Sequence, residues 1–231
     1  MCDFGSPAQP ARQVAPASVE YTSIQAAPMA AGVTRQAAPK AGAAVAQITR
    51  QKIDGLLFQN KRLFIAIDGR CAAGKTTLAA FLSGIYQCSV IPMDHFFLRK
   101  EQRTPGRLSE PGGNVDHERF LAEVLDQLRR GGDFSYRPYD CSQMGFGEAV
   151  CLPEKAVNII EGSYSCHPSL FDFYDLRLFL TIKPEEQFRR ILERNGPVRA
   201  EDFRNKWIPL EELYFSAFNI EGRCDLCVDC D

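Results

Sequence analysis

Residues 69–76 are the feature that most constrains this chain. They read Gly-Arg-Cys-Ala-Ala-Gly-Lys-Thr and match the pattern G-x-x-x-x-G-K-[ST]. An apolar run at 63–68 precedes them and helix-forming residues follow them. Glycines let backbone N–H groups turn inward around phosphate oxygens, and the N-terminus of the next helix adds the positive end of its dipole. The segment therefore predicts a phosphate-binding loop, or P-loop, between a strand and a helix.

The P-loop pattern also predicts which residues hold a nucleotide and its metal ion. Lys75 would reach the β- and γ-phosphates of ATP, and the Thr76 hydroxyl would ligate Mg²⁺. Cys71 lies near a helix N-terminus, where the pKa of a thiol can fall, so its oxidation could block ATP binding. The residues expected to contact the nucleotide are Gly69, Arg70, Cys71, Ala72, Ala73, Gly74, Lys75, Thr76 and Thr77.

Short apolar runs alternate with longer amphipathic segments along most of the chain. Strands are expected at 63–68, 88–94, 156–161, 176–182 and 224–230, and helices at 45–60, from Lys75, at 117–130 and at 184–195. Continuously apolar strands separated by helices indicate a parallel sheet that is covered on both faces. We therefore predict an α/β fold, the three-layer sandwich of P-loop NTPases. Its sheet would be mostly parallel and five-stranded, with helices on both faces, in one domain over residues 46–231.

The first 45 residues differ in composition from the rest. Ala and Pro dominate this segment, charges are few, and no helix or strand period persists. Such a segment buries too little apolar surface to offset its ordering entropy, so we interpret residues 1–45 as a disordered tail. The alternative is an organelle transit peptide, because the segment is poor in acids and carries Arg12, Arg35 and Lys40.

Charge and hydropathy exclude several classes of partner. Lys and Arg number 27 and Asp and Glu number 29, which gives a formal net charge of −2. A partner recognised through its phosphate backbone needs a basic excess, so nucleic acid is not expected. No apolar run approaches the ~20 residues that span a bilayer, and no secretory signal opens the chain. We expect a cytoplasmic protein.

Two acids follow predicted strands. Asp94 comes after an apolar run at 90–93, and Glu161 comes after another at 157–160. In an open parallel sheet, ligands bind outside the carboxyl ends of the strands. A kinase needs one carboxylate to accept a hydroxyl proton and another to hold Mg²⁺, both near the γ-phosphate. Their placement favours a functional role for both acids.

An ordered set of motifs over residues 60–230 resembles the uridine kinase branch of P-loop kinases, which includes phosphoribulokinase and pantothenate kinase. The P-loop alone is shared by many families, and the complete set is more specific. Besides the P-loop with Thr77, it comprises IPMDHFF (91–97), GGNVDHERF (112–120), RPYD (137–140), IIEG (159–162) and EEQFRRILERNG (185–196).

The resemblance implies roles for individual residues. Asp94 matches the general base that takes the proton of the acceptor's primary hydroxyl, and Glu161 matches the acid associated with Mg²⁺. Asp116 matches the acid that holds sugar hydroxyls. Tyr139 matches the aromatic residue beside the nucleobase.

The predicted helix at 184–195 carries arginines that resemble those of a lid. Arg190 and Arg194 would close over the transferring phosphate, where guanidinium groups can follow charge spread over its oxygens. The alternative is a solvated helix face. On it the arginines, Arg189 included, would pair with Glu185, Glu186 and Glu193.

One departure from the family bears on the substrate. After RPYD, uridine kinases carry a Ser-His-x-Arg stretch that recognises the pyrimidine, whereas this chain reads CSQMGFGEAV with Met144 at the position of the His. Uridine as the substrate is therefore unsupported, while phosphorylation of some primary alcohol is still expected.

The expected activity is an ATP- and Mg²⁺-dependent transfer of the γ-phosphoryl group to a primary hydroxyl of a nucleoside-like (uridine-like) or sugar-like acceptor. The partners would be ATP and this small molecule, and self-association into a homo-oligomer is left open. The first alternative is a nucleotide-binding regulatory ATPase without a small-molecule acceptor.

A second alternative is a metal- or redox-binding module centred on Cys224, Cys227 and Cys230, here called the cysteine triplet. The C-x-x-C step suits zinc or an iron–sulfur cluster. Against this, the triplet falls in the last predicted strand, where residues three apart point to opposite faces. Free cysteines ordinarily serve as small buried hydrophobes.

Overall fold

The computed structural model describes the backbone of residues 40–231 and the side chains from Val45 onward. The tail predicted for residues 1–45 lies, up to residue 39, outside the described part of the chain. Helix α1 (Lys40–Leu57) begins five residues ahead of the helix predicted from residue 45. None of the described helices is both long enough and apolar enough to span a membrane.

Five strands form the central sheet: β1 (Leu63–Gly69), β2 (Ser89–Pro92), β7 (Val157–Glu161), β8 (Leu176–Thr181) and β9 (Leu226–Asp229). Their order is β2-β7-β1-β8-β9, and every pairing is parallel. Strand β1 is central, with Ile65 in register with Ile159 on one side and Leu176 on the other. This confirms the predicted α/β fold and all five predicted strands.

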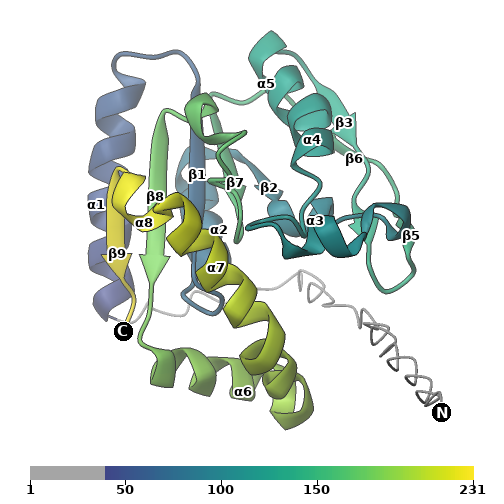
Figure 1. The fold of residues 1–231 in the computed structure, drawn as a ribbon. Helices are drawn as coiled ribbons and strands as arrows, with labels where there is room; N and C mark the ends of the chain where they lie inside the picture. Colours follow the sequence, from purple (N-terminus) through teal and green to yellow (C-terminus); the bar gives the residue numbers. More distant parts are fainter. Residues whose placement is uncertain (1–39) are drawn as a thin grey trace, which may run out of the picture.

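Alternate residues of β1 enter two separate hydrophobic cores. Ile65 and Ile67 pack with residues of α1 and α2 (Lys75–Tyr86) on one face of the sheet. Ala66 packs on the other face with the helical segment 117–130 and with α7 (Ile208–Phe218). Because strand side chains alternate between faces, a strand buried on both sides must be apolar throughout. The result is the predicted sandwich of three layers (Figure 1).

The helices differ in detail from the prediction. The segment 117–130 is helical throughout, and consists of α4 (His117–Phe120), a π-helical turn η3 (Leu121–Leu125) and α5 (Asp126–Arg130). Helix α6 (Pro184–Asp202) extends beyond residue 195, where the predicted helix ended. It is kinked at Gly196, which has a φ of 77° and is followed by Pro197. A second π-helical turn, η5 (Phe203–Trp207), leads into α7, and α8 (Ile220–Arg223) precedes β9.

Short elements between β2 and β7 gather on the β2 side of the sheet (Figure 1). None of them was predicted, because each is too short to show a period. They are the 3₁₀ turns η1 (Met93–Phe96) and η2 (Lys100–Gln102), helix α3 (Pro105–Ser109), the antiparallel pair β3 (Phe134–Tyr136) and β6 (Val150–Leu152), and the antiparallel pair β4 (Tyr139–Asp140) and β5 (Gly145–Phe146). A further 3₁₀ turn, η4 (Phe171–Phe173), precedes β8.

Candidate active site

The P-loop joins β1 to α2 and is shaped by two glycines. Gly69 has a φ of 128°, and a Cβ there would lie 2.1 Å from the carbonyl oxygen of Leu180, so only glycine fits. Gly74 caps α2 with a φ of 99°, and no side chain caps this helix end. The first N–H groups of a helix have no partner within it. The start of α2 therefore offers N–H donors to an anion, as nucleotide phosphates require.

Lys75 is the first residue of α2 and its side chain is folded back over the P-loop. Its Nζ donates to the carbonyl oxygens of Gly69 at 2.6 Å and Arg70 at 2.9 Å. Ser163 Oγ lies 3.3 Å from the same ammonium. The lysine is thus held at the loop, where it can exchange these neutral oxygens for phosphate oxygens.

Thr76 and Glu161 form the second part of the site. Thr76 Oγ1 lies 3.2 Å from both carboxylate oxygens of Glu161, the last residue of β7. Burial and the nearby charge of Asp94 raise the pKa of Glu161, while Lys75 and the Thr76 hydroxyl oppose this shift. A hydroxyl and a carboxylate beside a phosphate-binding loop are the hard oxygen ligands that Mg²⁺ takes, so these two residues fit that ion.

Asp94 lies in η1, two residues beyond the end of β2 rather than on the strand itself. Its side chain is exposed to solvent, yet the surrounding protein raises its pKa, against the opposing charges of Lys75 and Arg194. A carboxylate with a raised pKa is a stronger proton acceptor. The charges of Lys75 and Arg194 act on Asp94, and the charge of Asp94 acts on Glu161, so these groups lie within electrostatic reach of the Asp94 carboxylate.

A third carboxylate, Asp68, holds the P-loop in place through hydrogen bonds. It is fully buried at the end of β1, and burial raises its pKa to about 6. Its Oδ1 accepts hydrogen bonds from the N–H groups of Gly69 at 2.7 Å and Tyr164 at 3.2 Å. Its Oδ2 accepts from the N–H of Cys166 at 2.8 Å and the hydroxyl of Tyr214, on α7, at 2.9 Å. Asp68 therefore ties the P-loop to the segment after β7 and to α7.

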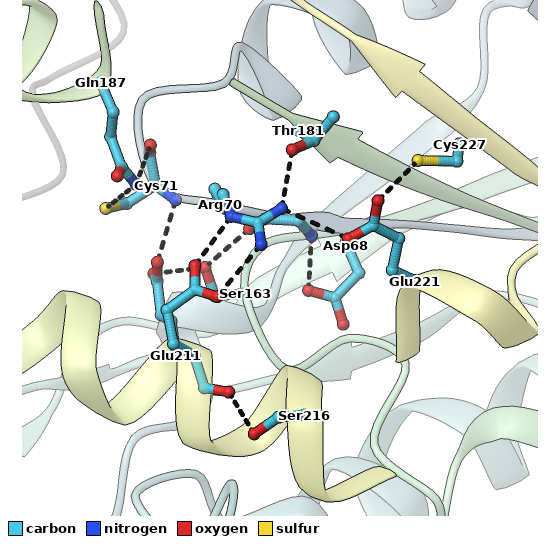
Figure 2. A network of polar contacts seen from close by, with 12 residues as sticks. Asp68, Arg70, Cys71, Ser163, Thr181, Gln187, Glu211, Ser216, Glu221 and Cys227 are labelled. Atoms are coloured by element: carbon cyan, nitrogen blue, oxygen red, sulfur yellow. Dashed lines mark hydrogen bonds and ion pairs between the residues drawn. The ribbon is translucent and has the colours of Figure 1, made fainter. Parts of the chain in front are cut away.

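Helix α7 holds the next two P-loop residues as well (Figure 2). The carboxylate of Glu212 accepts from Arg70 Nε at 2.7 Å and Nη2 at 3.0 Å. The neighbouring Glu211, which is buried, accepts from the N–H of Cys71 at 3.0 Å and from Ser163 Oγ at 2.7 Å. Sequence reasoning missed Glu211 and Ser163, because no motif signals a contact across 140 positions of the chain.

The structure contradicts the expectation for the Cys71 thiol. The side chain is buried, and burial together with the charge of Glu211 raises the pKa of this thiol. Gln187 Nε2 lies 3.2 Å from the sulfur and 3.1 Å from the Cys71 carbonyl oxygen. A buried neutral thiol is a poor target for oxidation, so a redox switch at Cys71 is not supported.

The two residues predicted to hold the acceptor lie beside η1. The N–H of Asp116 donates to the Phe96 carbonyl at 2.7 Å. The Asp116 side chain caps α4, because its Oδ1 accepts from the N–H of Arg119 at 3.1 Å. Its buried Oδ2 has no hydrogen-bond partner in the described chain and lies 3.7 Å from Arg99 Nε. Tyr139 is buried in β4, with its ring edge-on to that of Phe146.

The two predicted lid arginines have different surroundings. Arg190 donates to Glu186 at 2.6 Å, to the P-loop carbonyl of Ala72 at 3.3 Å and to the carbonyl of Cys230 at 2.8 Å. Arg194 donates to its neighbour Asn195 at 2.8 Å, and its charge acts on Asp94. Arg194 is thus within electrostatic range of Asp94, whereas Arg190 is hydrogen-bonded to the P-loop carbonyl of Ala72.

The cysteine triplet is not brought together. Cys224 lies 3.9 Å, sulfur to sulfur, from Cys166 in one core, whereas Cys230 packs against the other core. Cys227 is exposed and contacts Glu221 at 3.4 Å. Among residues 40–231, no three His, Cys, Asp or Glu side chains are grouped to hold a metal ion. The alternative of a metal module at the C-terminus has no support here.

Comparisons with known proteins give the fold. No protein-family model matches the chain, and no curated protein matches its sequence. A protein from Bacillus stearothermophilus described as a possible uridine kinase superposes with a TM-score of 0.52 at 22% identity, covering 79% of this chain and 100% of that one. YFH7 from Saccharomyces cerevisiae, described as a candidate P-loop-containing kinase with a circular permutation, superposes with a TM-score of 0.58 at 13% identity, covering 81% and 98%. The chain therefore shares the α/β fold of these two proteins, as its motifs predicted.

Proposed function

We propose that the protein is an ATP-dependent small-molecule kinase that transfers the γ-phosphoryl group to a primary hydroxyl of a nucleoside-like or sugar-like acceptor. The observation that carries this proposal is the convergence of Asp94 and Glu161 on Lys75 and Thr76. A loop that only binds nucleotide has no need of a second, solvent-accessible carboxylate at this place. A carboxylate that accepts a hydroxyl proton beside the γ-phosphate is what a kinase requires.

Asp94 is assigned as the general base. It accepts the proton of the acceptor hydroxyl as that oxygen bonds to the γ-phosphorus and the bond from the γ-phosphorus to the leaving ADP oxygen breaks. The pKa of this carboxyl is raised, which increases the driving force for proton uptake near neutral pH. Lys75 and Arg194 supply positive charge where the phosphoryl oxygens develop negative charge.

Thr76 and Glu161 would hold Mg²⁺. The chemistry that such an ion would supply is neutralisation of part of the negative charge of the nucleotide phosphates. The Thr76 hydroxyl lies 3.2 Å from the carboxylate, and this short distance supports the assignment of both residues to one ion. Arg190 is assigned a supporting role, because it donates a hydrogen bond to the P-loop carbonyl of Ala72. Arg194 is assigned as the lid arginine.

A coupled assay of ADP release tests the proposal. Purified full-length protein with ATP and Mg²⁺ is offered nucleosides, pantothenate, polyols and phosphosugars, and an acceptor is expected to stimulate ADP release. With that acceptor, Asp94→Asn should bind nucleotide normally and lower turnover by about 10²–10⁴-fold, because it removes the base and leaves the P-loop intact. Near-normal turnover in Asp94→Asn would refute the base assignment. Slow hydrolysis that no acceptor stimulates would favour a regulatory ATPase instead.

A further inference from the structure

Two thiols from distant parts of the chain lie against each other. The Sγ atom of Cys166, which follows β7, lies 3.9 Å from that of Cys224, which ends α8, across 58 positions of the chain. We propose that these two residues form a reversible disulfide when a peroxide oxidises them, and that this bond fastens α8 and β9 to the segment that holds Asp68. The proposal goes beyond the kinase function and does not depend on it.

Both cysteines belong to the same core. Cys166 is fully buried there, and Cys224 packs against it while its own side chain stays partly exposed. The sulfur atoms of a disulfide lie about 2.05 Å apart, so these two must approach each other by about 2 Å. Rotation about the Cα–Cβ bonds moves the sulfur atoms over distances of this order. The native packing therefore holds the two thiols together before they react.

Cys166 is part of the segment that supports the P-loop. Its backbone N–H donates to Asp68 Oδ2 at 2.8 Å, and the hydroxyl of Tyr214 donates to the same oxygen at 2.9 Å. Asp68 Oδ1 accepts in turn from the N–H of Gly69, the first residue of the P-loop, at 2.7 Å. A covalent bond at Cys166 would thus attach its partner to the groups that hold the P-loop.

Cys224 joins α8 to the edge strand β9, which pairs with β8 alone in the described chain. Helix α8 enters the core through the buried Ile220, whose carbonyl accepts from the Cys224 N–H at 3.1 Å. Glu221 of α8 also reaches Arg70 of the P-loop at 3.4 Å, but its side chain is 47% exposed. Edge strands and partly exposed ion pairs resist local opening only weakly. A covalent link to the core therefore has much to add here.

The difference in exposure sets the order of the two oxidation steps. Burial, the contact with Cys224 and the charge of Asp68 all raise the pKa of the Cys166 thiol, so Cys166 is not the first to react. The partly exposed Cys224 reacts first. Its sulfur attacks one oxygen of the peroxide, the O–O bond breaks, and a sulfenic acid and one water are formed.

Cys166 then converts the sulfenic acid to a disulfide. Its sulfur attacks the sulfur of Cys224, the S–O bond breaks, and the departing hydroxide takes the Cys166 proton to form a second water. Two thiols have then lost two electrons and two protons, and one hydrogen peroxide has become two waters. A thiol reductant reverses the bond by exchange. Cys71 differs, because Nε2 of Gln187 rather than a second thiol lies beside its sulfur.

Peptide mapping of the full chain tests whether the bond forms. The native protein is treated with hydrogen peroxide, its free thiols are alkylated, and it is digested without reduction by proteases that cut before Asp and after Lys. Cys166 and Cys224 then fall in separate peptides, 156–171 and 207–224, neither of which contains another cysteine. We expect these peptides to be linked after oxidation and to be separated again by dithiothreitol.

Thermal unfolding tests whether the bond fastens α8 and β9. A disulfide that closes a loop of this length should raise the Tm of the oxidised protein by about 5–15 °C over that of the reduced protein. Cys224→Ser and Cys166→Ala should each abolish the rise. Cys227→Ser is the matched control, since it removes an exposed thiol of β9 and should keep the rise. The Tm of each reduced variant shows whether it is folded, and Cys224→Ser carries the test if Cys166→Ala is not.

The outcomes separate the parts of the proposal. Absence of the linked peptides, with Cys224 recovered as a higher acid or joined to Cys227 or Cys230, overturns the disulfide. Linked peptides without a rise in Tm overturn the fastening of α8 and β9, and a rise that Cys224→Ser keeps overturns the assignment to this pair. Neither measurement involves ATP or an acceptor, so a failure here leaves the proposed kinase function standing, and a failed acceptor screen leaves the disulfide standing.

Discussion

Replacing Glu211 by Ala should loosen the P-loop from a distance. The Glu211 carboxylate accepts hydrogen bonds from the N–H of Cys71 at 3.0 Å and from Ser163 Oγ at 2.7 Å. In the variant, Ser163 can still donate to the Gly69 carbonyl at 3.2 Å, whereas no other acceptor is recorded for the Cys71 N–H among the described residues. A buried donor left without a partner costs about 1–3 kcal/mol. We therefore expect Glu211→Ala to lose that much free energy of unfolding.

The same loss should appear in nucleotide binding. In the variant, part of the free energy of ATP binding is needed to restore the loop conformation. A loss of about 1.4 kcal/mol in binding free energy corresponds to a tenfold rise in Kd. We expect the Kd for ATP to rise by about tenfold. Urea unfolding measures the first quantity and calorimetric titration with ATP measures the second. Glu211→Gln keeps one oxygen acceptor for the Cys71 N–H. It should therefore lose less free energy of unfolding and less affinity for ATP than Glu211→Ala.

The next residue along the helix supplies a matched control. Glu212 pairs with Arg70, but its side chain is 43% exposed, and Arg70 keeps its bond to Thr181 at 2.7 Å. A partly exposed ion pair contributes about 0–1 kcal/mol, so Glu212→Ala should cost less than Glu211→Ala. The reasoning is refuted if the two variants are equally stable, or if Glu211→Ala unfolds and binds ATP as the unmodified protein does.

Three further predictions follow from the site. Glu161→Gln should raise the Mg²⁺ concentration needed for half-maximal ADP release by about 10–100-fold, and an unchanged Mg²⁺ titration would remove this residue from the metal site. Burial raises the pKa of Asp68 to about 6, so the folded protein holds a proton that the unfolded chain releases between about pH 4 and 6. Its contribution to the free energy of unfolding is thus largest at low pH and falls by about 3 kcal/mol as pH rises through this window. Urea unfolding at pH 5 and pH 7 should show this component, and Asp68→Asn should lack it. Metal analysis of purified protein should find no stoichiometric zinc or iron, and a bound ion would restore the cysteine triplet as a site.

The elements that the sequence predicted best are those whose burial is uniform. The strands around the P-loop are covered on both faces, so they appear as unbroken apolar runs and their limits were predicted to within one or two residues. Helix α6 was predicted to end near residue 195, because Gly196 and Pro197 ordinarily terminate a helix. In the structure the chain bends at Gly196 and resumes a helical course, since packing of the following turns outweighs the local signal.

The contacts between α7 and the P-loop could not be predicted in the same way. Glu211 and Glu212 are adjacent and chemically identical, yet one is buried against Cys71 and the other lies partly exposed against Arg70. Which of them meets a loop amide depends on the rotation of α7 about its own axis. That rotation is decided by the packing of side chains such as Tyr214 and Phe215 in the core. No local spacing encodes it.

The positions of Asp94 and Glu161 near the P-loop were predictable because the strands of the sheet are parallel. In a parallel sheet every strand ends at the same edge, so acids that follow β2 and β7 must lie at the edge where β1 delivers the P-loop, whatever the order of the strands. The observed order places β7 between β2 and β1, with Glu161 in register with both Pro92 and Ile67. The parallel sheet does not fix the positions of residues that reach the site from helices. For that reason Arg190 and Arg194, predicted together from one helix, have different surroundings, and only Arg194 acts on Asp94.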